Sequence, residues 1–260
     1  MRYASLGSGS KGNATLIAEG DTTVLVDCGF AAREAIARME RLAFDPASLR
    51  AVLVTHEHGD HGKGVRALCR KLNIPAYMSA GTAIGLKSRQ EPHVRIIDAT
   101  STFQLGSIEV QPVIVPHDAR ETCQFVFSAG GARLGLLTDL GHITPFIAQC
   151  YQNLDALILE ANHDPVMLAE GPYPASLKRR VGGDFGHLSN EQSADLLRQM
   201  DLDRLQQVVI AHISEQNNDP ARARTVLAAA MPGHEHKLRI STQEAGFDWC
   251  QVQTRIEDPA

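Results

Sequence analysis

The stretch Ala51-Val52-Leu53-Val54-Thr55-His56-Glu57-His58-Gly59-Asp60-His61 decides the fold of this chain. Its apolar first part predicts a short buried strand, and the polar turn that follows gathers three histidines and an aspartate. Neutral imidazoles together with a carboxylate are the ligand set that suits zinc, and also manganese or iron. The stretch therefore predicts a metal site on a loop at a strand end, with a solvated polar turn as the alternative.

Strand-like and helix-like patterns recur on both sides of this stretch. Strands are predicted at 2–6, 14–18, 23–26, 108–115, 123–127, 134–137, 156–159, 208–211, 237–240 and 247–252. Helices are predicted at 31–42, 64–72, 190–200 and 220–231, and a long loop with Gly and Pro before residue 190. We therefore expect an α/β protein, an αββα sandwich of two mixed β-sheets flanked by helices, forming a single domain over residues 1–260.

Composition excludes several classes of protein. The 260 residues include 25 basic and 30 acidic side chains, giving a formal net charge of −5, and 5% are aromatic. This balance argues against a protein that coats nucleic acid through its net charge or stacks RNA bases on an aromatic platform. Five widely spaced cysteines favour a reducing compartment. No apolar run reaches the length of a signal peptide or a membrane span, so we expect a cytoplasmic protein without a membrane partner.

Four further candidate site residues follow predicted strands elsewhere in the chain: Asp27 in Leu-Val-Asp-Cys-Gly, His117 in Val-Pro-His-Asp-Ala, Asp139 in Leu-Thr-Asp-Leu and His212 in Ile-Ala-His-Ile. Each alone is weak, because a lone histidine after a strand is more often an ordinary loop residue. Their order and their placement at strand ends resemble the metallo-β-lactamase superfamily, and the resemblance covers nearly the whole chain.

That resemblance implies a dinuclear metal centre. It implies one ion held by His56, His58 and His117, a second held by Asp60, His61 and His212, Asp139 bridging the two, and Asp27 as a structural residue behind the ligands. Two divalent ions, zinc or manganese, would supply hydroxide near neutral pH and neutralise charge on a phosphodiester.

Two segments point to the nuclease branch of this superfamily. Leu159-Glu160-Ala161-Asn162 resembles the Glu-containing segment of RNase Z and of the β-CASP nucleases, and Gly186-His187-Leu188-Ser189 resembles the nuclease motif in which a His precedes a capped helix. Ser189 and Gln192 have the spacing of a capping box. By this resemblance Glu160 and His187 relay a proton to the leaving oxygen, and with Asp60 they are the expected catalytic residues.

The remaining strings, residues 8–13, 27–29, 116–119 and 212–220, resemble the YycJ/WalJ group of bacterial metallo-β-lactamase-fold proteins. The resemblance implies a 5′-to-3′ exonuclease acting on single-stranded DNA, with metal-activated hydroxide attacking phosphorus. The alternatives are an RNase Z-like RNA-processing nuclease, a thioester or lactone hydrolase on the same site, and a non-enzymatic nucleic-acid-binding protein with a vestigial site. No insert resembling the RNase Z arm is evident, and the native metal, the DNA or RNA preference, the polarity and the oligomeric state stay open.

Any grip on the phosphates of nucleic acid must be local in a chain of net charge −5. The candidate substrate contacts are Lys11 and Asn13 in the N-terminal turn, Arg120 beside His117, His142 after Asp139, and Lys178, Arg179 and Arg180 in the loop leading to His187. A solvated basic loop is the alternative for each.

Overall fold

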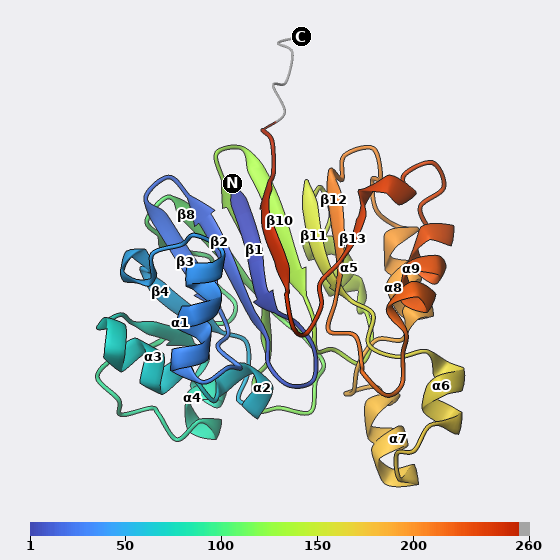
Figure 1. Ribbon diagram of the computed structural model, residues 1–260, viewed down its shortest axis with the longest axis horizontal. Coiled ribbons are helices and arrows are strands. Elements are labelled where there is room, and N and C mark those ends of the chain that lie inside the picture. The colour runs from blue at the N-terminus through green and yellow to red at the C-terminus, as the bar shows by residue number, and fades with distance from the viewer. Residues whose placement is uncertain (255–260) are drawn as a thin grey trace.

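Two mixed β-sheets form the centre of the molecule, a computed structural model that describes residues 1–254 (Figure 1). Within those residues the first sheet has the order β14 (Phe247–Gln251), β1 (Arg2–Gly7), β2 (Ala14–Glu19), β3 (Thr22–Val26), β4 (Ala51–Val54), β5 (Ala76–Met78), β6 (Val94–Ile96). The second has the order β13 (Leu238–Ile240), β12 (Gln207–Ala211), β11 (Ala156–Glu160), β10 (Ala132–Leu137), β9 (Cys123–Ala129), β8 (Ile108–Ile114), β7 (Phe103–Leu105). The expected pair of mixed sheets is confirmed.

Helices cover the outer faces of both sheets, which completes the expected αββα order (Figure 1). On the first sheet lie α1 (Ala32–Arg41), α3 (Val65–Leu72) and α4 (Ala80–Gly85), and on the second α5 (Pro145–Cys150), α8 (Asn190–Leu197) and α9 (Pro220–Ala229). Short helical turns η1 (Pro46–Ser48), α2 (Gly59–Gly62) and η2 (Glu235–Lys237) complete these connections. Among residues 1–254 there is no helix with the length and apolar character that crossing a membrane requires.

The two sheets share one apolar core. Val24 and Val26 of β3 belong to the same buried cluster as Phe125 and Phe127 of β9 and Ile158 of β11. β11 and β12 are apolar along nearly their whole length because both faces of the second sheet are covered, one by the first sheet and one by helices.

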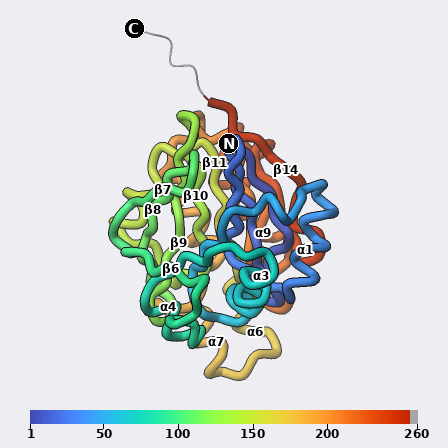
Figure 2. Tube along the Cα trace, turned by 90° about the vertical axis from the view of Figure 1, so that its left-hand side faces the viewer, coloured from blue at the N-terminus to red at the C-terminus, as the bar shows by residue number. Residues whose placement is uncertain are grey.

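The segment between β11 and α8 is not the loop that the sequence suggested. It contains α6 (Pro165–Glu170) and α7 (Ala175–Val181), so Lys178, Arg179 and Arg180 lie on a helix and the loop assignment is wrong. The prolines that suggested a loop instead begin these helices: Pro165 is the first residue of α6 and Pro174 caps α7. Both helices project beyond the sheets on one side, as Figures 1 and 2 agree.

The order of the strands explains where the candidate ligands meet. β3 is parallel to β4, and β10, β11 and β12 are mutually parallel, so within each sheet these strands end at one edge. β8 runs in the same direction as β10, because each is antiparallel to β9. The residues that follow these strands are therefore collected at one edge of the sandwich.

Candidate metal centre

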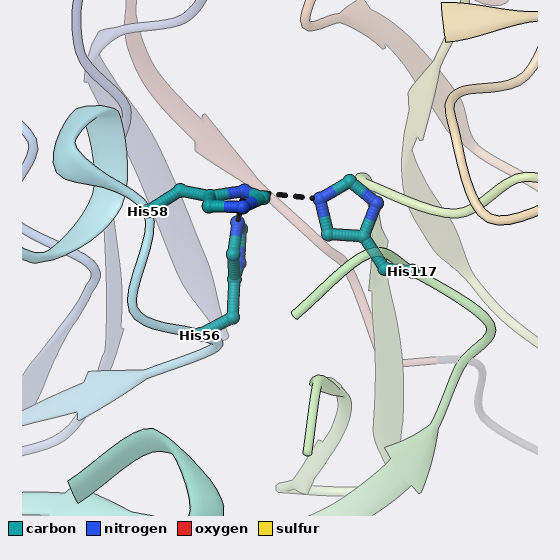
Figure 3. Close-up of side chains that lie close together, drawn as sticks. All are labelled: His56, His58 and His117. Carbon is teal, nitrogen blue, oxygen red and sulfur yellow. Dashed lines mark hydrogen bonds between the residues drawn. The ribbon is translucent and has the colours of Figure 1, made fainter. Parts of the chain in front are cut away.

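Three histidines converge at this edge from two different loops (Figure 3). The Nε2 atom of His56 lies 3.0 Å from Nδ1 of His58, which in turn lies 3.2 Å from Nε2 of His117. His56 is fully buried, whereas His58 is half-buried and borders a cavity of about 330 Å³. The loop after β4 and the loop after β8 thus present three ring nitrogens to one point.

A second group lies beside the first and contains carboxylates. Asp60 Oδ2 lies 3.4 Å from His61 Nε2 and 3.5 Å from His212 Nε2. Asp139 reaches the same two nitrogens, at 3.4 Å from His61 and 3.5 Å from His212. All seven residues that the resemblance named as ligands are therefore brought together by the fold.

The Nδ1 atom of each buried imidazole has a polar partner, which leaves the Nε2 atom to face the metal site. Nδ1 of His56 contacts the Thr55 hydroxyl at 2.9 Å, and Nδ1 of His61 contacts Asp27 at 2.7 Å. Nδ1 of His117 lies 3.0 Å from the Gly186 carbonyl, and Nδ1 of His212 lies 3.0 Å from Glu160. Supporting contacts of this kind orient metal-bound histidines and set their tautomer.

The distances between these donor atoms fit a metal ion. A tetrahedral zinc ion with ligand bonds of about 2.0–2.1 Å places its ligand atoms roughly 3.3 Å apart, and the contacts within both groups are 3.0–3.5 Å. Two atoms aimed into the second group, Asp139 Oδ2 and His212 Nε2, are buried without a hydrogen-bond partner among residues 1–254. Buried polar atoms rarely stay unpaired, so the residues present fit a bound cation.

Backbone strain is concentrated at the same place. Asp27, Asp139 and His212 follow strands and adopt left-handed backbone angles, with φ of 62°, 56° and 51°. Residues other than glycine adopt such angles at a cost, and they persist where the surrounding structure imposes them. Each of the three turns a side chain at a strand end toward the donor atoms of the site.

The loop that carries His58 and Asp60 is held by backbone hydrogen bonds from Asn13, which precedes β2, and from Cys28, which follows β3. The amide of Cys28 donates to the His61 carbonyl and that of Asn13 to the Asp60 carbonyl, both at 2.8 Å. A Cβ atom at Gly29 would lie 1.7 Å from the Asp60 carbonyl oxygen. Only glycine leaves room for this contact, which explains the glycine in Leu-Val-Asp-Cys-Gly.

The two groups differ in their electrostatics. Burial lowers the pKa of His56 and of His117, so these two imidazoles of the first group are neutral at pH 7. Burial also opposes protonation of His212, but Asp139, Asp60 and Glu160 outweigh it and raise the pKa of His212 to about 10. The pKa of His61 is raised for the same reason, by Asp139, Asp27 and Asp60. Without metal, His61 and His212 are therefore protonated, and their positive charges pair with the carboxylates of the second group.

A buried pair of side chains adjoins the ligands. Glu160, the last residue of β11, is fully buried and lies 2.8 Å from Nδ1 of His187. Burial alone would raise the pKa of Glu160, but His187 and His212 lower it to about 2, so Glu160 is ionised. His187 precedes α8, whose start is fixed by the capping box of Ser189 and Gln192 that the sequence predicted. One further set of side chains is close enough together to hold a metal ion: Asp139, Glu160, His187 and His212. The hydrogen bonds that Glu160 forms with His187 and with His212 account for this closeness without an ion.

The candidate substrate contacts are scattered, and Arg180 alone among them lines the cavity. Lys11 pairs with Glu215, Asn13 lies behind Asp60 and His61, and Arg120 and Arg179 are exposed. Nδ1 of His142 contacts the Asp184 carbonyl at 2.9 Å, and Lys178 donates to the Ala169 carbonyl at 2.6 Å.

Several residues at the site were missed from the sequence. Thr55 contacts Asp27 and His56, and its place directly before the first ligand was the available signal. Asp118 follows His117 and pairs with Arg180, and Asn162 donates to the His212 carbonyl at 2.9 Å. Leu177 of α7 and Tyr173, just before α7, line the cavity, but no local pattern in the sequence indicates this helix.

We expect Asp27→Asn to weaken metal binding about 10–100-fold, because Asp27 orients a ligand. Its carboxylate accepts from the Thr55 amide and hydroxyl, both at 2.8 Å, and contacts His61 Nδ1. A carboxamide has one acceptor oxygen, so it cannot serve all three groups. Competition with a fluorescent zinc chelator measures the affinity, and the exposed Asp21→Asn is the control. Equal affinities of the two variants would mean that Asp27 does not position His61.

Comparison with known proteins places this geometry in a family. The family model described as the beta-lactamase superfamily domain matches residues 22–213. The chain is 32% identical to exodeoxyribonuclease YycJ of Bacillus anthracis, over 86% of each chain. It is also 32% identical to exodeoxyribonuclease WalJ of Streptococcus pneumoniae, over 84% of this chain and 83% of the relative.

The solved structures agree on the fold. The metallo-beta-lactamase fold protein YhfI of Bacillus subtilis superposes with a TM-score of 0.72 at 18% identity, covering 95% of this chain and 97% of its own. The matched family model, the two relatives aligned over most of their length and the shared fold lead to one conclusion: this chain belongs to the beta-lactamase superfamily.

Proposed function

We propose that this protein is a metal-dependent nuclease that removes nucleotides from single-stranded DNA in the 5′-to-3′ direction. The observation that carries the proposal is the Glu160–His187 pair, hydrogen-bonded at 2.8 Å, in which His187 lines the same cavity as the candidate ligands His58, Asp60, Asp139 and His212. A phosphodiester needs both a nucleophile and a proton for its leaving oxygen, and this arrangement offers a place for each. The names of the two relatives that align over most of their length support the same substrate class.

We further propose that two divalent ions, zinc or manganese, occupy the site. His56, His58 and His117 would hold one, Asp60, His61 and His212 the other, and Asp139 lies within reach of both groups. Bound there, such ions lower the pKa of a coordinated water and neutralise charge on the phosphate.

The protein's own groups handle the leaving oxygen. Ionised Glu160 accepts the Nδ1–H of His187, which leaves Nε2 of His187 to carry a second proton on the cavity side. His187 donates that proton to the departing 3′-oxygen. Glu160 stabilises the charged imidazole and holds it in place, and the Leu188 amide, which donates to Glu160 at 3.1 Å, fixes the carboxylate in turn.

The unequal protonation of the two groups predicts an unequal pH dependence of metal uptake. Neutral His56 and His117 bind an ion near pH 7 without releasing protons, whereas His61 and His212 must first lose theirs. Affinity at the second group should therefore rise as the pH rises toward about 10, the raised pKa of His212. Calorimetry at pH 7 in buffers of different ionisation enthalpy counts the protons released by each ion. Equal release by the first and second ions would contradict this assignment.

A thioester or lactone hydrolase is the competing activity. A thiolate leaves without being protonated, so thioester hydrolysis has no evident need for a buried Glu160–His187 pair, whereas the alkoxide that leaves a phosphodiester does. A panel of bis-p-nitrophenyl phosphate and an acyl thioester separates the two, and we expect hydrolysis of the phosphate ester only.

A time course on single strands labelled at either end tests substrate and polarity together. With zinc or manganese, we expect 5′-labelled DNA to lose its label as a short product while 3′-labelled DNA shortens gradually. RNA of the same sequence should be cut more slowly. Early release of the 3′ label would show that cleavage starts from the 3′ end, which contradicts the proposed direction. Faster cutting of RNA would favour the RNase Z-like alternative.

A further inference from the structure

The inner face of α7 forms one wall of the cavity beside the metal ligands. Tyr173, Leu177, Arg180 and Val181 all line it. Leu177, Arg180 and Val181 belong to α7, and their spacing of three and four residues from Leu177 is that of one helical face, while Tyr173 lies two residues before the helix begins at Ala175. We call these four residues the α7 stripe, and it combines an aromatic ring, two aliphatic side chains and one cation.

Backbone contacts connect the end of α7 to the residues of the site. The His187 amide donates to the Val181 carbonyl at 2.8 Å, and a Cβ atom at Gly186 would lie 2.1 Å from that same carbonyl oxygen. The Gly186 carbonyl in turn faces Nδ1 of His117. These contacts fix the position of the end of α7 relative to His117 and to the proposed proton donor His187. The helix itself projects from the sheets (Figures 1 and 2).

Arg180 is the one lysine or arginine among the described residues that line this cavity. Its guanidinium pairs with Asp118, whose other oxygen lies 3.5 Å from His117 Nε2. The side chain of Arg180 stays 55% exposed, so its remaining N–H groups are open to an anion. Its neighbours on α7 differ: Lys178 is bound to the Ala169 carbonyl and Arg179 does not reach the cavity.

We propose that the α7 stripe binds the nucleotide next to the bond that is cut. Tyr173 and Leu177 contact the face of its base, and Arg180 binds its phosphate, with Asp118 holding the guanidinium in position beforehand. This inference rests on the proposed nuclease function and adds a source of strand selectivity. The face of a base is free to meet a protein side chain only when the base is unstacked, so a single strand fits and a duplex does not.

Two substitutions test the stripe in the full-length, metal-loaded protein. Tyr173→Ala should raise the KM for a single-stranded oligonucleotide at least about fivefold, as expected when a stacked base loses its ring. The same variant should match the wild type on a strand whose terminal nucleotide lacks its base. A general loss of structure would weaken both strands equally, and that result would overturn the base contact.

Arg180→Ala should also raise KM, and should reduce the dependence of log affinity on log salt concentration by about 0.7, the contribution of one phosphate contact on a single strand. The control is Arg198→Ala, which removes another exposed arginine paired with an aspartate, Asp195. An unchanged salt slope in Arg180→Ala, with wild-type DNA hydrolysis intact, would overturn the phosphate contact alone. Failure of the wild type to cut DNA would instead overturn the proposed function.

Discussion

His58→Ala is expected to abolish hydrolysis of single-stranded DNA, lowering kcat/KM by at least about 10³-fold. A catalytic metal ion contributes several kcal/mol to stabilising the transition state, and each 1.36 kcal/mol is a factor of ten. His58 offers the central nitrogen of the first group, 3.0 Å from His56 and 3.2 Å from His117, so its loss leaves two of the three histidines of that group.

The fold should survive this change. The His58 side chain is 29% exposed and belongs to a loop, so alanine leaves no buried cavity. Metal analysis should find less bound metal, while the melting temperature of the metal-free protein stays the same. His236→Ala, at an exposed histidine far along the chain, is the matched control. Wild-type turnover in His58→Ala would remove the first group from the mechanism.

His187→Ala should have a different signature: metal content stays at the wild-type level, while kcat falls about 10²–10⁴-fold, the usual contribution of a general acid. The residue lies next to the ligands, yet its Nδ1 is engaged by Glu160. Turnover and metal content measured on the same preparation separate this outcome from that of His58→Ala.

A leaving group that needs no proton provides the internal check. p-Nitrophenolate leaves without protonation, so bis-p-nitrophenyl phosphate should lose far less rate than DNA in His187→Ala. Glu160→Gln should show the same pattern as His187→Ala, with a larger loss of rate on DNA than on bis-p-nitrophenyl phosphate. The reason is that a neutral carboxamide no longer stabilises the charged imidazole of His187. Unchanged DNA cleavage by His187→Ala at neutral pH would exclude the proton relay.

The long apolar strands and the ligand loop could be predicted from the sequence because they carry strong local signals. Ala51–Val54 is apolar throughout and is followed at once by the metal loop, and two mixed sheets were expected, although no order of strands within them was predicted. β5, β6 and β7 were missed because each has three residues, too few for any periodicity to appear.

The site was predictable only as far as its ligands. His117 and His212 could be proposed because each follows a strand, and parallel strands end at the same edge. Arg180 was named as a candidate substrate contact but was placed in a loop, and Tyr173, Leu177 and Val181 were not named. The short helix α7, which brings Arg180 to the cavity, has a proline before it and a glycine after it. Those residue types indicate a loop locally, and only the packing of α7 against the site reverses that reading.

Metal titration tests the central claim most directly. Protein stripped with a chelator is supplied with zinc or manganese in steps, and hydrolysis of 5′-labelled single-stranded DNA is followed at each step. We expect no hydrolysis without metal, and activity that rises until two equivalents are bound per chain. Full hydrolysis in the presence of EDTA, or full activity with one equivalent or less bound per chain, would contradict a nuclease that needs two metal ions.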